Sequence, residues 1–405
     1  MNRSHIRKKR KHLPLCCLFL CLTTPVFSQQ DTLKVLYPSG QIKEVFEIKV
    51  TNSDTMKSGF YKYFYPNQNL GQKGFFHNNQ PDSLWHLYYP TGELKKKLHF
   101  HKGFRHGKYQ VYYKNGHLKQ EGKYRDGKIN GLFKTYYQDD TLESMTQYTM
   151  GQQEGIKKLY YSHGELYAEY QVKNGIPDGK WLQYYKNGKI NYRGKKHSGQ
   201  FTDTLKVYYK NGQLKRVCFY QNGQLNGSYQ AFHPNGSIMI KCQYQKGKIT
   251  DEYRSYYPSG TIKEKGSYNI FGEKTGTWKT FYQDSLLHGE GLYKCGRYSG
   301  VWTIYHPNGK LKQIGRYRKG KATGFWKYFH ENGKIKSYGK YFMDMKTGPW
   351  QFCTNQGVVH KIEHYRNDRR DGPAWLLDKG KRQTIIFQNG LPLIIHNQHN
   401  QMPTR

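Results

Sequence analysis

Aliphatic residues, acids and prolines are all scarce in this sequence. Hydrophobic residues of every kind make up 36% of its 405 positions, and only 14 positions are proline. So little apolar material would suit a disordered chain. Aromatic residues nevertheless reach 16%, with 38 Tyr, which is far more than disordered chains carry. We therefore expect a folded chain whose apolar burial comes largely from Tyr, Trp and Phe.

The shortage of acids leaves a large unbalanced positive charge. Asp and Glu total 28 against 66 Lys and Arg, and the formal net charge is +38. A field of this sign favours acidic partners, such as an acidic protein, an acidic glycan, anionic lipid head groups or nucleic acid. The charge by itself does not choose among them.

Motifs that carry catalysis or bind metal are missing from the sequence. HExxH, GxSxG, a Walker loop and a GxGxxG that opens a helix do not occur. No CxxC pair and no Cys/His pair at zinc spacing occurs either. The acids are scattered, and the adjacent Asp139 and Asp140 fall in a turn, where local backbone hydrogen bonding favours Asp. We expect no enzyme activity, no metal site and no cofactor.

The N-terminal residues predict export. Residues 3–11 are strongly basic, residues 13–22 are apolar, and Val26-Phe27-Ser28 places compact residues before a cleavage site between Ser28 and Gln29. The apolar stretch is short for a membrane anchor, and Cys21 lacks the small preceding residue that a lipid anchor needs. We expect a periplasmic, cell-surface or secreted protein with no transmembrane span after cleavage.

A 24-residue repeat fills most of the chain, as a turn signal shows. The turn residue, called position 0 here, recurs at intervals of 24 with one interval of 25. The strong copies are Gly92, Gly116, Asp140, Gly164, Gly188, Gly212, Gly236, Gly260, Ser285, Gly309 and Gly333, and fainter ones surround Gly40, Gln68, Gly357 and Gly380. The predicted organisation is a signal peptide at 1–28, an array of about 14 repeats at 29–390, and a tail at 391–405.

Columns of the repeat predict strands. Position −4 is always aromatic, +2 is Leu or Ile, +6 is mostly small and +8 is mostly Tyr, whereas odd positions after the turn carry Lys, Glu and Arg. Positions +2 to +8 of even number should share one strand face. Three His replace Tyr at −3 as aromatic substitutes: His233, His306 and His330. The column proposed as a binding face is −4, with Tyr88, Tyr112, Tyr136, Tyr160, Tyr184, Tyr208, Tyr256 and Tyr305.

Each repeat reads as a β-hairpin. Asn-Gly or similar turns join its strands at position 0, and second turns are predicted near Ser198-Gly199, at Pro177-Asp178-Gly179 and at Lys346-Thr347-Gly348. Because a lone hairpin is marginal in water, stacking should bury the aromatic columns, with the small +6 residue leaving room for a neighbouring ring. The predicted fold is all-β: an elongated repeat protein with a single twisted antiparallel β-meander, on the order of 130 Å long before twist.

Cysteine is too sparse for a disulfide framework. Three of the seven Cys lie in the first 28 residues, and the others are Cys218, Cys242, Cys295 and Cys353. In a meander, one strand separates Cys218 from Cys242, so their Cα atoms should lie roughly 9–10 Å apart, beyond disulfide reach. We expect both to be free thiols.

These columns carry a family resemblance. Residues 315–333, GRYRKGKATGFWKYFHENG, resemble the MORN repeat in the variant form of bacterial proteins, and the resemblance extends over nearly all of 33–390. It implies a twisted β-meander with a binding or scaffolding role, and some members bind lipids or dimerise. Some bacterial relatives are labelled antitoxins of the YwqK family, although a signal peptide does not suit a cytoplasmic antitoxin.

The sequence leaves three functions open. The first is a non-enzymatic, exported protein-interaction scaffold of the cell envelope, of which an antitoxin-like or immunity-like binder of an unknown protein is one form. The second is a basic binder of polyanions or anionic membrane surfaces. The third is a spacer without a single ligand. Nucleic acid is disfavoured as a partner because an exported protein rarely meets it.

Overall fold

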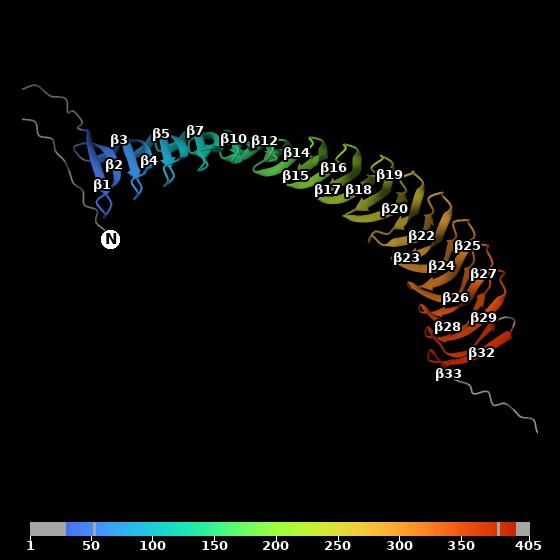
Figure 1. Cartoon of the computed structure of the whole chain (residues 1–405). Coiled ribbons are helices and arrows are strands. Elements are labelled where there is room, and N and C mark those ends of the chain that lie inside the picture. Colours follow the sequence, from blue (N-terminus) through green and yellow to red (C-terminus); the bar gives the residue numbers. More distant parts are fainter. Residues whose placement is uncertain (1–29, 52–53, 379–380, 394–405) are drawn as a thin grey trace, which may run out of the picture. The chain divides into compact units, whose positions relative to one another are not determined.

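The structure is a computed structural model that describes residues 30–51, 54–378 and 381–393. Within these ranges it contains strands and turns but no helix, as Figure 1 shows. The chain divides into two compact units, residues 1–200 and residues 201–405. The predicted all-β class is therefore confirmed, and each unit is described by itself.

In the first unit, successive strands pair in an antiparallel meander. Short β9 and β10 both pair with β8. The strands are β1 (Gln30–Leu36), β2 (Ile42–Val50), β3 (Thr55–Phe64), β4 (Leu70–His77), β5 (Gln80–Tyr88), β6 (Leu94–His101), β7 (Phe104–Tyr112), β8 (Leu118–Arg125), β9 (Lys128–Ile129), β10 (Gly131–Tyr136), β11 (Leu142–Thr149), β12 (Gln152–Tyr160), β13 (Leu166–Lys173), β14 (Ile176–Tyr184) and β15 (Ile190–His197).

The second unit repeats this plan, and its β29 pairs with both β30 and β31. Its strands are β16 (Gln200–Tyr208), β17 (Leu214–Gln221), β18 (Gln224–Phe232), β19 (Ile238–Gln245), β20 (Lys248–Tyr256), β21 (Ile262–Tyr268), β22 (Lys274–Phe281), β23 (Leu287–Lys294), β24 (Arg297–Tyr305), β25 (Leu311–Arg318), β26 (Lys321–Phe329), β27 (Ile335–Phe342), β28 (Met345–Cys353), β29 (Val359–Arg366), β30 (Arg369–Arg370), β31 (Gly372–Asp378), β32 (Lys381–Gln388) and β33 (Leu391–Leu393). The last strand lies just beyond the predicted end of the array at residue 390.

The position 0 turns follow one hydrogen-bond pattern. In the repeat at Gly188, the Gly188 N–H donates to the carbonyl of Tyr185 at 2.9 Å, and the Tyr185 N–H donates to the carbonyl of Lys189 at 2.8 Å. Gly188 has a φ of 76°, whereas Asn187 before it does not adopt a positive φ. This is a type I turn followed by a left-handed residue, which explains why Gly dominates position 0. The fainter copies at Gly40, Gln68 and Gly357 have the same bond, and Gly380 lies outside the described residues.

Most of the second turns are two-residue type I′ turns, in which both residues have positive φ. Asn174 and Gly175 have φ of 51° and 79°, and the predicted turn at Ser198-Gly199 is confirmed with 50° and 80°. The turns predicted at residues 177–179 and 346–348 are wrong, because those residues lie inside β14 and β28.

Those misread residues form β-bulges at position −9. Gly179 and Gly348 have φ of 113° and 65°, and the strand register shifts beside them. A bulge and a turn both favour Gly and short polar residues, so their sequence signatures coincide.

One exceptional turn accounts for the 25-residue interval between Gly260 and Ser285. Here the β21–β22 connection is not a two-residue turn. The Asn269 N–H donates to the Glu273 carbonyl and the Gly272 N–H donates to the Asn269 carbonyl, both at 2.9 Å. This is the position 0 pattern used at the opposite end of a hairpin, and it needs the additional residue.

The core is a row of rings on one face, which we call the aromatic face. It carries positions −11, −7, −5, +4, +6 and +8. The −7 and +8 rings pack edge to face along the second unit: Trp278 lies 5.2 Å from Tyr268 and 5.9 Å from Tyr293 between ring centroids. Such offset geometry is favoured between aromatic rings. Trp278 and Trp350 are only 1% exposed.

The small residue at +6 makes room for these rings, as predicted. At five positions, a Cβ on the +6 glycine would lie 2.0–2.3 Å from Cδ2 of the Trp at −7 of the following repeat. The pairs are Gly74 with Trp85, Gly266 with Trp278, Gly291 with Trp302, Gly315 with Trp326 and Gly339 with Trp350. Position +2, in contrast, pairs with −4 because the register shifts there.

Hydrogen bonds from the side chain at position −3 join each repeat to the next. The Tyr113 hydroxyl donates to the carbonyl of Tyr136 at 2.8 Å, and equivalent bonds recur in both units. His306 Nε2 takes the place of the hydroxyl, 3.1 Å from the Phe329 carbonyl, and His233 and His330 do the same. Because a carbonyl can only accept, each Nε2 carries the proton. The His residues are therefore confirmed as substitutes for Tyr.

The two +6 cysteines are separated by one strand, as predicted. Cys218 on β17 and Cys242 on β19 both pair across from Tyr229 on β18. Both are buried, free thiols, as is Cys353, whereas Cys295 is exposed. Burial raises the pKa of Cys218 and raises that of Cys242 to about 11.

Candidate mixed binding face

The opposite face of the sheet, which we call the mixed face, carries positions −8, −6, −4, +5 and +7. Contacts fix the −4 residues there: the Tyr136 hydroxyl donates to Glu121 Oε1 at 2.7 Å, and the Tyr160 hydroxyl lies 3.4 Å from Met145 Sδ. Glu121 and Met145 are both at +5. The −4 column is half-buried in each unit, and comprises Tyr88, Tyr112, Tyr136, Tyr160 and Tyr184, then Tyr208, Tyr256 and Tyr305. These side chains thus line one face, but they are not fully exposed.

Positions −6 and +5 form a row of cross-strand neighbours. In much of the row the charges balance: Lys134 Nζ lies 3.4 Å from Glu121 Oε1, and Lys158 Nζ lies 3.0 Å from Glu169 Oε2. Partly exposed pairs of this kind contribute little to stability, about 0–1 kcal/mol. They do, however, neutralise this part of the mixed face.

The N-terminal part of the same row is basic without compensation. Lys62, Lys73, His86 and Lys97 are successive cross-strand partners. Burial, and then the charges of Lys73 and Lys97, lower the pKa of His86. The positive charges of Lys62, Lys73 and Lys97 along this row favour an anion.

Exposed apolar side chains lie along the columns at −8 and +7, beside the tyrosines. Phe75 at +7 is 52% exposed and Phe325 at −8 is 63% exposed. Leu132, Ile156 and Val301 at −8 are also exposed. Apolar groups gathered on one face, next to charged ones, are typical of an interaction surface.

Two hollows open on the mixed face, one in each unit. The first has a volume of about 380 Å³ and lies between Phe60 and Leu84, both at −8. The second, also of about 380 Å³, lies between Val301 and Phe325, again both at −8. The repeat therefore builds the same hollow twice.

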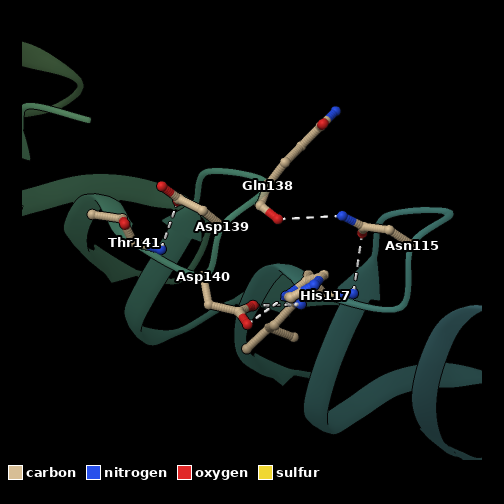
Figure 2. Close-up of polar contacts among 7 residues, drawn as sticks. Asn115, His117, Gln138, Asp139, Asp140 and Thr141 are labelled. Atoms are coloured by element: carbon tan, nitrogen blue, oxygen red, sulfur yellow. Dashed lines mark hydrogen bonds and ion pairs between the residues drawn. The ribbon is translucent and has the colours of Figure 1, made fainter. Parts of the chain in front are cut away.

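The turn edge of the sheet accounts for the adjacent acids, as Figure 2 shows. Asp139 Oδ1 accepts a hydrogen bond from the Thr141 N–H at 3.0 Å, and this backbone bond lowers the pKa of Asp139. Asp140, which replaces Gly at position 0, reaches back to His117 Nδ1 of the preceding turn at 2.5 Å and to the Leu118 N–H at 3.2 Å. Both carboxylates lie in exposed turns: Asp139 stabilises its own turn, and Asp140 joins its turn to the preceding one.

Within the described ranges, no group of three or more His, Cys, Asp or Glu is placed to hold a metal ion. The same ranges contain no helix that could cross a lipid bilayer. The predicted cleavage site at Ser28 and Gln29 lies outside the described residues.

Sequence reasoning found the tyrosine column but not the hollows. The apolar residues at their rims alternate with Lys and Arg along the strand. The residue type at each of these positions also differs between repeats, so no single column is apolar throughout. A signal was present, since Phe60 and Leu84 occupy equivalent positions in adjacent repeats. Its meaning depends on the neighbouring strands, because the lining of each hollow comes from three strands at once.

Comparison with known proteins supports the repeat. The family model described as the MORN repeat variant matches seven times, at residues 105–126, 177–195, 204–222, 225–246, 252–269, 298–319 and 323–342. No curated protein matches the chain in sequence.

Several solved structures show a distant likeness. A chain in the TcdB2-TccC3-Cdc42 crystal structure is 11% identical over 88% of this chain and 24% of its own length, with a TM-score of 0.12. A chain in the structure of the Photorhabdus luminescens Tc holotoxin pore is 11% identical over 88% of this chain and 23% of its own length, with a TM-score of 0.11. This chain thus spans about a quarter of those two chains.

A porin-like protein from Bacteroides uniformis is 9% identical over 60% of this chain and 88% of its own, with a TM-score of 0.14. At such low TM-scores, none of these likenesses bears on function. The seven matched repeats lie on the hairpins described above. The chain belongs to the MORN repeat variant family.

Proposed function

We propose that the protein is a non-enzymatic, exported scaffold of the cell envelope that binds a protein partner through its mixed face. One observation carries the proposal. The rings of the aromatic face pack against one another in a row around buried Trp side chains, whereas the mixed face sets a column of half-buried Tyr beside exposed apolar and charged columns. The rings that stabilise the sheet are thereby separated from the groups available to a partner.

The chemistry of the mixed face suits protein contact. Tyr offers a large amphipathic surface with few rotatable bonds, so little entropy is lost when a partner orders it. Aromatic and Arg side chains are enriched at protein interfaces. An antitoxin-like or immunity-like binder is one form of this role. The predicted signal peptide supports an envelope location.

A non-enzymatic role is supported by the places of the acids and histidines. Asp139 and Asp140 bind turn groups, and the −3 histidines donate to backbone carbonyls. These groups act in holding the sheet together.

The basic row from Lys62 to Lys97 favours a second candidate, a binder of polyanions or anionic membrane surfaces. The salt dependence of binding distinguishes the two candidate functions. Attraction to a polyanion falls steeply as salt rises, because bound counterions are released. Contact through apolar and aromatic groups is screened much less.

The test is capture of envelope proteins on the immobilised protein at about 50 and 150 mM salt. The variant Leu132→Ser/Ile156→Ser changes two exposed apolar residues of the mixed face. Its control is Ile270→Ser/Phe271→Ser, two exposed apolar residues in the β21–β22 turn at the edge of the sheet.

We expect one or a few proteins to be retained at both salt concentrations by the wild type and the control, and lost from the mixed-face variant. Retention that the mixed-face variant keeps in full would refute the proposal. Loss of all capture at the higher salt, together with strong retention on heparin, would favour the polyanion candidate.

A further inference from the structure

The geometry points to two equivalent peptide sites on the mixed face. We propose that each hollow takes one aromatic or branched apolar side chain of an acidic peptide segment, whose carboxylates pair with the cations at the rim. The inference rests on the proposed function, because it names the partner chemistry of the same face.

The first hollow joins an apolar floor to a basic rim. Phe60, Phe75 and Leu84 supply apolar surface, and Lys62, Lys73 and His86 line the same space. These residues come from three adjacent strands, β3, β4 and β5. Among the described residues, Lys62 and Lys73 have no ion-pair partner, and the lining includes no carboxylate.

The second hollow reproduces this arrangement in the other unit. Val301 and Phe325 form its sides, Ile314 lies between them, and Arg316 and Lys327 line it. Its strands, β24, β25 and β26, correspond to β3, β4 and β5 of the first hollow, with cations again at −6 and on the middle strand. The described lining again includes no carboxylate.

A hollow of about 380 Å³ lies at the small end of the range that ligand pockets occupy, about 300–1,000 Å³. That space suits one large side chain and its flanking backbone. The cations at its rim have no acidic partner, so they favour negative charge on the ligand. An apolar side chain flanked by Asp or Glu meets both requirements.

Other occupants meet only one requirement. A linear polyanion supplies charge but no apolar group to fill the hollow. A bilayer surface presents head groups first, so an apolar floor of bounded size would stay empty. The chemistry of the lining therefore selects a peptide, and the other occupants become outcomes of the test.

The probe is the peptide Ser-Gly-Asp-Asp-Phe-Asp-Asp-Gly-Ser, titrated calorimetrically into the purified protein. One control peptide replaces its Phe by Ser, and another replaces its four Asp by Asn. We expect about two binding sites per chain for the probe. Each control peptide should bind at least about tenfold more weakly, which corresponds to a loss of about 1.4 kcal/mol of binding free energy.

Three protein variants locate the sites. Lys62→Gln/Lys73→Gln should leave one peptide site per chain, and so should Phe325→Ser in the second hollow. Lys158→Gln is the matched control, a lysine of the same row that lies outside both hollows and pairs with Glu169, and it should leave both sites. All variants should show the wild-type thermal unfolding, because the changed side chains lie at the surface.

The inference would be overturned if the probe did not bind at about 1 mM, which corresponds to a binding free energy weaker than about −4.1 kcal/mol. A site number that the hollow variants leave unchanged would overturn it as well. If the control peptide in which Ser replaces Phe bound as tightly as the probe, the site would be a polyanion site instead.

The two proposals fail separately. If no peptide binds but the Leu132/Ile156 variant loses its captured protein, only the hollow assignment is wrong. If peptides bind the hollows but no envelope protein is captured, the scaffold proposal is wrong.

Discussion

Gly315→Ala tests whether an absent side chain at +6 is what allows Trp to build the core. A Cβ at residue 315 would lie 2.0 Å from Cδ2 and 2.2 Å from Cε2 of Trp326. Contact begins to be ordinary at 3.4 Å, so the ring must retreat by about 1.4 Å from a close-packed site. Trp326 is only 2% exposed, and the ring atoms concerned are its rigid centre.

The expected magnitude follows from two opposing effects. Overpacking a core of this kind costs about 1–3 kcal/mol. Gly315 does not have a positive φ, so alanine there also gains about 0.4–1 kcal/mol by restricting the unfolded chain. We expect a net loss of about 1–2 kcal/mol in local stability.

Trp326→Tyr supplies the internal control. A smaller ring already lies beside a larger +6 residue elsewhere, where Cys218 on β17 pairs with Tyr229 on β18. The double variant Gly315→Ala/Trp326→Tyr should therefore be more stable than the sum of the single effects predicts, by about 1 kcal/mol.

The assay must read local stability, because repeat arrays need not unfold in one step. Hydrogen exchange of β25 and β26, followed by mass spectrometry, gives the free energy of local opening. Unchanged or slower exchange in Gly315→Ala would refute the reasoning. Additive effects in the double variant, within about 0.3 kcal/mol, would refute it as well.

Three further outcomes are expected. Trp350→Phe should cost about 1 kcal/mol more than Trp326→Phe in local exchange, because Trp350 Nε1 donates to the Lys340 carbonyl at 3.1 Å whereas Trp326 Nε1 has no partner among the described residues. Tyr113→Phe should cost about 0.5–1.5 kcal/mol and speed exchange on both sides of the lost −3 bond, and unchanged exchange would contradict that bond. In native protein a thiol reagent at pH 8 should label exposed Cys295 first, and the buried pair Cys218 and Cys242 only after denaturation. Because burial raises the pKa of Cys242 to about 11, its native labelling should speed up only as the pH rises towards that value. A thiol count in denaturant that increases on reduction would instead reveal a disulfide.

The sequence by itself determined the architecture of the repeat. Its 24-residue period, its left-handed residue at position 0 and its alternation of apolar and charged residues specify hairpins, because each is a local property of φ or of strand parity. The +6 glycines and the free Cys218 and Cys242 followed from the same parity, since residues one period apart must be separated by one strand.

Only the tertiary structure decided which face each column occupies. The bulge at −9 resets strand parity, and its Gly and Asp look in sequence like the turn that was predicted at residues 177–179. A second register shift, between −5 and −4 beside the position 0 turn, separates the −4 tyrosines from the +4 to +8 column. These tyrosines face the charged row, opposite the Trp core. The hollows depend on three strands at once, so their residues gain a common meaning only after the register and the bulges have brought them together.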